Sequence, residues 1–208
     1  LGDFSRKKNV AGIKPMDVRR SGAAGSMPTA MKRSQAHCIG WLVPTLVFAV
    51  SFTVFFPTLQ NQFVSWDDNA SLLANPDYRG FDWRRLRWMF STFYMGHYQP
   101  LSWLTLALDY TFWGMNPFGY HLTNLIFHSV NALLAYWVAL RLLSAALSQP
   151  PNITLRTAAG LAALSFAIHP LRVESVAWVT ERRDVLSGMF FLLTILSYLT
   201  AASVAAGG

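Results

Sequence analysis

The run IGWLVPTLVFAVSFTVFF, residues 39–56, holds eighteen residues and no charge. As a helix it is about 27 Å long, close to the ~30 Å hydrocarbon thickness of a bilayer. A basic segment precedes it, as in a secretory signal peptide. However, the run exceeds the apolar core of such a peptide, roughly 7 to 15 residues, and the following Pro57-Thr58-Leu59-Gln60 lacks a small-x-small cleavage pattern. The run therefore predicts a first transmembrane helix over residues 39–57.

The net charge of +7 belongs mainly to the segment before this run. Eight of the 17 Lys and Arg residues precede residue 34, against two of the ten acidic residues, so this segment carries +6. The rest of the chain is nearly neutral and offers no extended basic surface to a nucleic-acid backbone. We therefore expect no nucleic-acid partner, and residues 1–38 are predicted to be a disordered basic tail in the cytoplasm.

Three further apolar runs predict three more helices. Residues 120–147 and 185–204 are long enough for a second and a fourth transmembrane helix. Residues 157–169 form a short third helix, which crosses only if it starts near Ile153 with Arg156 reaching toward the headgroups. Otherwise this segment is re-entrant. We favour the crossing, which gives an all-α polytopic bundle with about four transmembrane helices.

Charge near the span ends sets the orientation, because cytoplasmic flanks carry the excess of Lys and Arg. The basic tail places the N-terminus in the cytoplasm. The expected connections are a first outer loop over residues 58–119, a cytoplasmic loop over 148–156 and a second outer loop over 170–184. The protein is thus expected to be a multi-pass membrane protein, and its single cysteine, Cys38, excludes an intrachain disulfide.

Adjacent carboxylates stand in the first outer loop, at Asp67 and Asp68. Such a pair suits a general base or a share in a metal site, because each carboxylate perturbs the other. The surrounding DDNAS is also good capping chemistry for a helix. On spacing alone a solvated turn or helix cap is the better interpretation. This interpretation and the catalytic or metal-binding pair both stay open.

The segment DWRRLRWMF, residues 82–90, predicts an amphipathic helix on the membrane surface. Trp83, Leu86 and Phe90 fall on one face, and arginines fall on another. The first outer loop is therefore expected to lie along the bilayer.

A polar stripe marks the second transmembrane helix, at His121, Asn124, His128 and Asn131. These positions lie within an arc of about 80° at 100° per residue. Polar side chains in a membrane helix face other helices or a wet cavity. Interhelical hydrogen bonding is the favoured interpretation, because two helical turns separate the histidines and make a metal site poor.

The second outer loop, within HPLRVESVAWVTERRDVLSG, packs six ionisable groups against a membrane span. Groups at this depth are costly and are functional candidates by default. If the segment is one helix, Glu174 and Glu181 share a face, with Arg182 and Asp184 on its flanks.

Three stretches now suggest a family: FVSWDD, YQPLSWLTLALDYTFWGMNPFGYHLTNLIFHSVNALL and HPLRVESVAWVTERRDVLSGMFFLLTILSYL. In order and spacing they resemble the membrane region of the transmembrane and tetratricopeptide-repeat O-mannosyltransferase-like proteins, particularly bacterial members. The resemblance covers about residues 40–200. Two departures are that Gln99 stands where animal members often carry Arg, and that no tetratricopeptide repeat is present. The chain looks like the N-terminal part of a longer enzyme.

The resemblance implies a type C glycosyltransferase (GT-C) in the bacterial inner membrane. Such an enzyme takes a sugar, mannose by the family's name, from a polyprenyl-phosphate donor to a hydroxyl on a protein or glycan acceptor. The resemblance places the catalytic carboxylate at Asp67 and Asp68. Candidates for the donor or acceptor site are His97, Tyr98, Arg172, Glu174, Arg182 and Asp184.

For the leaving phosphate, Arg182 is our first choice and Arg172 our second, since an arginine holds a phosphate bidentately. No metal ligands are assigned. A divalent cation on Asp67 and Asp68 stays open, although oxygen sites usually need more donors than this pair. The alternative function is a non-catalytic membrane anchor for a C-terminal tetratricopeptide-repeat domain that binds other proteins.

Overall fold

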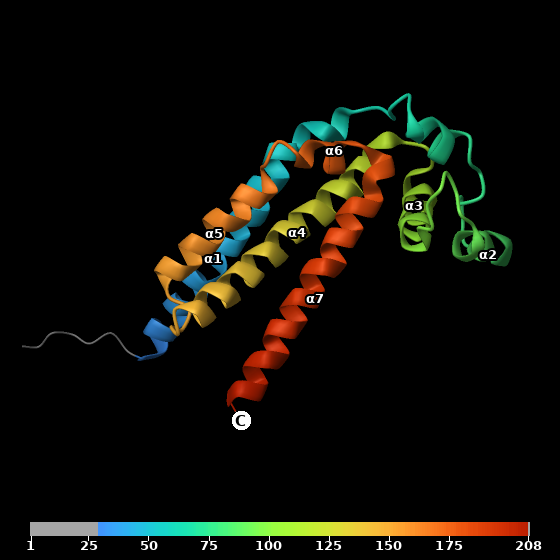
Figure 1. Ribbon diagram of the computed structural model, residues 1–208. Helices are drawn as coiled ribbons and strands as arrows, with labels where there is room; N and C mark the ends of the chain where they lie inside the picture. The colour runs from blue at the N-terminus through green and yellow to red at the C-terminus, as the bar shows by residue number, and fades with distance from the viewer. Residues whose placement is uncertain (1–28, 208) are drawn as a thin grey trace, which may run out of the picture.

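The computed structural model describes residues 29–207, which are helical apart from short connections. Four helices run along one another in a bundle (Figure 1). They are α1 (Thr29–Phe55), α4 (Pro117–Ala146), α5 (Ile153–Ala167) and α7 (Arg182–Gly207). The tail predicted over residues 1–38 lies outside the described residues up to Pro28, and from Thr29 onward the chain is part of α1.

Three stretches are long and apolar enough to cross a membrane: Gly40–Gln60, Pro117–Ala146 and Val179–Ser203. Residues 29–207 contain no β-strand, only an isolated bridge between Tyr94 and His97. The all-α polytopic membrane fold predicted from the hydropathy pattern is therefore confirmed, and the protein is a membrane protein.

Helix α4 lies in the middle of the bundle and packs against α1, α5 and α7. Its inward face places Ala132, Tyr136 and Leu140 in one apolar core with residues of α1 and α5. The interface between α1 and α5 is close, because a Cβ built on Gly160 would stand 2.7 Å from a methyl carbon of Val43. The small residue at this position therefore lets the two helices approach.

Helix α5 begins at Ile153, the start that a crossing requires, and Asn152 caps it by accepting a hydrogen bond from the Leu155 amide. The Nη1 of Arg156 donates to the carbonyl oxygen of Gly40, where the spanning stretch of α1 begins, at 3.1 Å. The reach of Arg156 toward the headgroups stays a prediction. In Figure 1 the helix runs beside α1 and beside part of α4.

Two connecting segments gather at one end of the bundle, which we call the loop end: residues 56–116 and residues 168–181 (Figure 1). Direct hydrogen bonds between Asp68 and Thr180 join the two segments. The short helices in them are Phe56–Gln60, Asn69–Leu73, α2 (Trp83–Ser91), α3 (Pro100–Trp113), α6 (Arg172–Ala177) and Val179–Glu181.

Helix α2 confirms the helix predicted over residues 82–90, and Asp82 caps it by accepting from the Arg85 amide at 3.1 Å. Its place on the membrane surface stays a prediction. Trp83 is 78% exposed, whereas Trp88 turns inward against Trp103 of α3. Helix α3 was not expected, because fourteen residues are too few for a span and the segment read as part of a loop.

The second connecting segment is not one helix. Helix α6 ends at Ala177, Trp178 is extended, and a short 3-10 turn precedes α7. The condition for a shared face of Glu174 and Glu181, one continuous helix, is therefore not met.

Candidate active site at the loop end

Asp68 is completely buried, and both of its carboxylate oxygens accept hydrogen bonds from the chain. Its Oδ1 accepts from the amide and the hydroxyl of Thr180, at 3.0 and 2.5 Å, and its Oδ2 accepts from the Val64 amide at 2.9 Å. It makes no side-chain capping bond to the helix that follows. The solvated-turn and capping interpretations are therefore both wrong for Asp68, which ties together two segments far apart in the chain.

Asp67 lies half-buried beside it and lines a small cavity of about 40 Å³. The cavity collects side chains from both connecting segments: Asp67, Ser71, Met95, His97, Gln99, Thr180 and Arg183. One carboxylate, one imidazole and one guanidinium thus share a recess at the loop end. Such a group can take up a proton and hold a polar or anionic ligand.

A tight turn presents His97 to this cavity. The backbone N–H and C=O of Tyr94 and His97 pair with each other, at 2.9 and 3.0 Å. Met95 and Gly96 complete the turn at φ of 49° and 82°, the left-handed region that glycine adopts at little cost. Tyr98 points elsewhere: its hydroxyl donates to the Phe90 carbonyl oxygen of α2 at 3.0 Å.

Arg183 pairs with Glu181 at 2.5 Å and was not among the sequence candidates. Neither was Thr180, which orients Asp68. Both lie within the charged stretch that the sequence singled out. No spacing rule selects them, since the helix break at Trp178 decides which side chains turn toward Asp67.

Arg182 is fully buried and does not line this cavity. Its Nη2 donates to Asp109 Oδ2 at 2.7 Å and to the Tyr120 carbonyl oxygen at 2.9 Å, and its Nε donates to Asn124. Burial raises the pKa of Asp109, while Arg182 and a 2.6 Å hydrogen bond from Thr123 act against that rise. The ion pair connects α3, α4 and α7.

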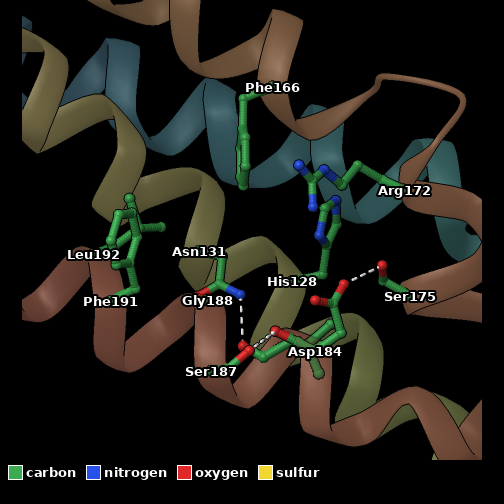
Figure 2. A pocket seen from close by; sticks show the side chains of 11 residues that line it. His128, Asn131, Phe166, Arg172, Ser175, Asp184, Ser187, Gly188, Phe191 and Leu192 are labelled. Atoms are coloured by element: carbon green, nitrogen blue, oxygen red, sulfur yellow. Dashed lines mark hydrogen bonds between the residues drawn. The ribbon is translucent and has the colours of Figure 1, made fainter.

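The other candidates of the second connecting segment lie apart from Asp67. Arg172 and Asp184 line a larger cavity of about 450 Å³ between the helices, shown in Figure 2. Glu174 is exposed and lines neither cavity. Of the predicted site residues, Asp67 and His97 line the recess and Arg172 and Asp184 line the larger cavity. The other four, Asp68, Tyr98, Glu174 and Arg182, line neither.

The polar stripe of α4 faces its neighbours, as predicted. All four side chains are at most 3% exposed. Asn124 donates to the Trp178 carbonyl oxygen at 3.1 Å, Asn131 donates to the Val185 carbonyl oxygen at 2.8 Å, and His128 contacts the Ala167 carbonyl oxygen at 2.9 Å. Interhelical hydrogen bonding is thus confirmed for three of the four residues.

Comparison with known proteins finds similar sequences among the protein O-mannosyl-transferases. Protein O-mannosyl-transferase Tmtc1 of Drosophila melanogaster is 34% identical over 158 residues, which cover 72% of this chain and 17% of that protein. Human TMTC1 is 33% identical over 164 residues, with 74% and 17% covered. Drosophila Tmtc2 is 34% identical over 163 residues, with 73% and 16% covered.

No protein-family profile matches the chain. No solved structure matches it either. The chain spans about a sixth of the length of the curated relatives it matches.

The fold and the loop end together define a polytopic, all-α membrane protein with ionisable groups gathered at one end of its bundle. Within that class, the chain is a TMTC-like protein, similar to the TMTC protein O-mannosyl-transferases over 72–74% of its own length. The resemblance drawn from the sequence is confirmed, while a bacterial source stays a prediction.

Proposed function

We propose that this chain forms part of a membrane glycosyltransferase of GT-C type. The enzyme transfers mannose from a polyprenyl-phosphate donor to a hydroxyl group of a protein, at the loop end, which faces away from the cytoplasm. The relatives named protein O-mannosyl-transferases support this reaction class. The observation that carries the proposal is the unequal use of two adjacent carboxylates, of which Asp68 is engaged by the backbone and Asp67 lines a polar recess.

Asp67 is the proposed general base. An acceptor hydroxyl is a weak nucleophile, so a carboxylate within hydrogen-bond reach takes its proton as the oxygen attacks the anomeric carbon of the sugar. The new C–O bond forms while the bond between that carbon and the phosphate oxygen breaks. The polyprenyl phosphate leaves with the electron pair, and its charge is stabilised by a cationic side chain.

Of the two arginines expected to hold this phosphate, Arg172 fits better than Arg182. The guanidinium of Arg182 is buried and already bound to Asp109. Reaching a ligand would cost Arg182 this pair, and breaking a buried pair by removing one partner is strongly destabilising. We therefore propose that Arg182 positions the start of α7 and that Arg172 contacts phosphate.

The residues around Asp67 do not fit a divalent cation bound by protein alone. Among residues 29–207 no group of three or more His, Cys, Asp or Glu side chains lies close enough to hold a metal ion. Both oxygens of Asp68 already accept hydrogen bonds from the chain. No step of the proposed reaction is therefore assigned to a cation.

The test is donor-dependent transfer by the full-length gene product in its membrane, with a labelled polyprenyl-phosphate mannose and an acceptor protein. Asp67→Asn should lower the rate by about 10²–10⁴-fold, the usual contribution of a general base, with unchanged expression. The matched control is Asp77→Asn, a surface carboxylate of the same segment paired with Arg84 at 3.4 Å, which should keep full activity. Unchanged transfer by Asp67→Asn would refute the general base.

A further inference from the structure

The recess around Asp67 is small. It encloses about 40 Å³, close to the ~30 Å³ that one water molecule occupies in the liquid. A hydroxymethyl group fits a volume of this order, whereas a hexose ring or a phosphate group is too large for it. The recess therefore suits the end of one short side chain.

The unpaired charge of the recess is negative. Arg183 lines it, but the Nε and Nη2 of this guanidinium donate to the Glu181 carboxylate, at 3.3 and 2.5 Å. Among residues 29–207, Asp67 is in no ion pair within 4.0 Å. A phosphate would therefore meet an uncompensated carboxylate, whereas a neutral hydrogen-bond donor would be attracted to it.

The hydroxyl groups that line the recess are already used as donors. Ser71 donates to the sulfur of Met95 at 3.4 Å, and Thr180 donates to Asp68 at 2.5 Å. Asp67, when ionised, can only accept. An occupant of the recess must therefore bring its own donors.

Gln99 adds a second acceptor to the recess. Its Oε1 is buried and has no hydrogen-bond partner in the described part of the chain. Although Gln99 is the N-cap residue of α3, its side chain makes no capping bond. A buried carbonyl oxygen without a partner is costly, so a donor from an occupant is expected there.

The start of α3 holds Gln99 in place. The carbonyl oxygen of Gln99 accepts from the Trp103 amide at 3.2 Å, and Pro100 restricts the conformation of the residue before it. Trp103 is completely buried in the apolar cluster that α3 shares with α4. The amide of Gln99 is therefore presented from a rigid element, as a binding group requires.

A seryl or threonyl residue supplies donors for both Asp67 and Gln99. Its hydroxyl group and its backbone N–H stand on adjacent carbon atoms, so one residue can reach two neighbouring acceptors. A sugar acceptor carries hydroxyl groups but its ring does not fit the enclosed volume. The size of the recess therefore favours a hydroxyl group on a polypeptide.

We infer that the recess receives the acceptor rather than the donor, and that Gln99 accepts a hydrogen bond from the backbone N–H of the residue whose hydroxyl reacts. This acceptor contact rests on the proposed function and adds to it the group of the acceptor that is recognised. Gln99 is then a specificity-determining residue beside the base.

The experiment measures transfer from polyprenyl-phosphate mannose by the full-length gene product in its membrane. The probes are a synthetic peptide with one serine as its only hydroxyl residue, and the depsipeptide in which an ester oxygen replaces the N–H of that serine. Gln99→Leu should raise the KM for the peptide about fivefold, the usual contribution of one neutral hydrogen bond, and should not raise the KM for the depsipeptide. The KM for the donor should stay the same.

Two further variants control this result. Gln99→Glu keeps an accepting oxygen and should keep the preference for the peptide over the depsipeptide. Gln149→Leu, which removes an exposed glutamine between α4 and α5, should behave like the wild type with both probes.

An equal rise in KM for both probes would show that Gln99 acts only on the shape of the recess, and would overturn the inference. An unchanged KM for the peptide, or transfer to methyl α-mannoside in preference to the peptide, would overturn it as well. The proposed function fails differently: wild-type protein that transfers mannose to no acceptor, water included, is no transferase. Transfer that depends on Asp67 but not on Gln99 would leave the base standing and remove only the acceptor contact.

Discussion

Asp67 and Asp68 are neighbours in the chain but lie in different surroundings. Both carboxylate oxygens of Asp68 accept hydrogen bonds, from Val64 and from Thr180. The bonds from Thr180 connect the two segments at the loop end. Asp67 makes no such bonds and faces His97 and Arg183 across a recess. The first role needs a buried carboxylate with donors already in place, and the second needs an accessible one.

The buried pair of Arg182 and Asp109 allows a quantitative test of a positioning role. Arg182→Met should lower the free energy of unfolding by about 3–5 kcal/mol, because it leaves the Asp109 carboxylate buried without its cation. The double variant Arg182→Met with Asp109→Leu should recover most of this loss, since the uncompensated charge is removed as well. Thermal unfolding in detergent measures both. A double variant no more stable than Arg182→Met would contradict the assignment.

At the scale of the helices, α4 carries the polar contacts and α5 supplies the close packing. Asn124 of α4 donates to a backbone carbonyl oxygen of the second connecting segment, and Asn131 of α4 donates to one of α7. Helix α5 meets α1 through Gly160, where side chains larger than hydrogen do not fit. Polar side chains of α4 thus hold the loop end in position, and the small residue Gly160 lets α1 and α5 approach each other.

Gly160→Ala tests the contact between α1 and α5. The added methyl group would stand 2.7 Å from a methyl carbon of Val43, so the helices must separate, at a cost of about 1–3 kcal/mol. Adding Val43→Ala should restore stability, because it removes the methyl group that clashes. The measurement is the midpoint of thermal unfolding in detergent. An increase in stability for Gly160→Ala alone would mean that helix propensity outweighs the clash and that the contact is looser than described.

At the scale of the whole molecule, contacts at the loop end constrain the membrane topology. Thr180 follows α5 in the chain and Asp68 precedes α4, yet the two are in contact. Residues 168–181 and 56–116 therefore lie on the same side of the bundle. A re-entrant α5 would return its C-terminal end to the side of residues 147–152, so the crossing is the topology that we predict.

Cysteine labelling checks this topology and its direction. In a Cys38→Ser background, Ser91→Cys in α2 should react with a membrane-impermeant maleimide in intact cells. Ser148→Cys, between α4 and α5, should react only after permeabilisation. Both positions are exposed. Ser148 lies in a turn, with φ of 50°. Reaction of both in intact cells would exclude the crossing of α4, and the reverse pattern would invert the orientation.

Much of the helical architecture was predictable because it depends on short-range features. Residues 39–56 are apolar enough to span, and their hydropathy is a sum over neighbours in the chain. The stripe of α4 follows from the helical repeat, which fixes which side chains share a face. Helix α3 escaped prediction because its fourteen residues are stabilised by packing against α2 and α4 rather than by membrane length.

The assignment of roles within the site depended on distant contacts. Apolar runs and charge asymmetry are local properties, so they indicate spans, orientation and the presence of carboxylates near the membrane without any knowledge of the packing. Whether Asp68 or Asp67 stays accessible depends on Thr180, 112 residues away, and whether Arg182 or Arg172 is free depends on Asp109, 73 residues from Arg182. Pairings over such distances follow from how the helices pack, and no pattern in the chain encodes them residue by residue.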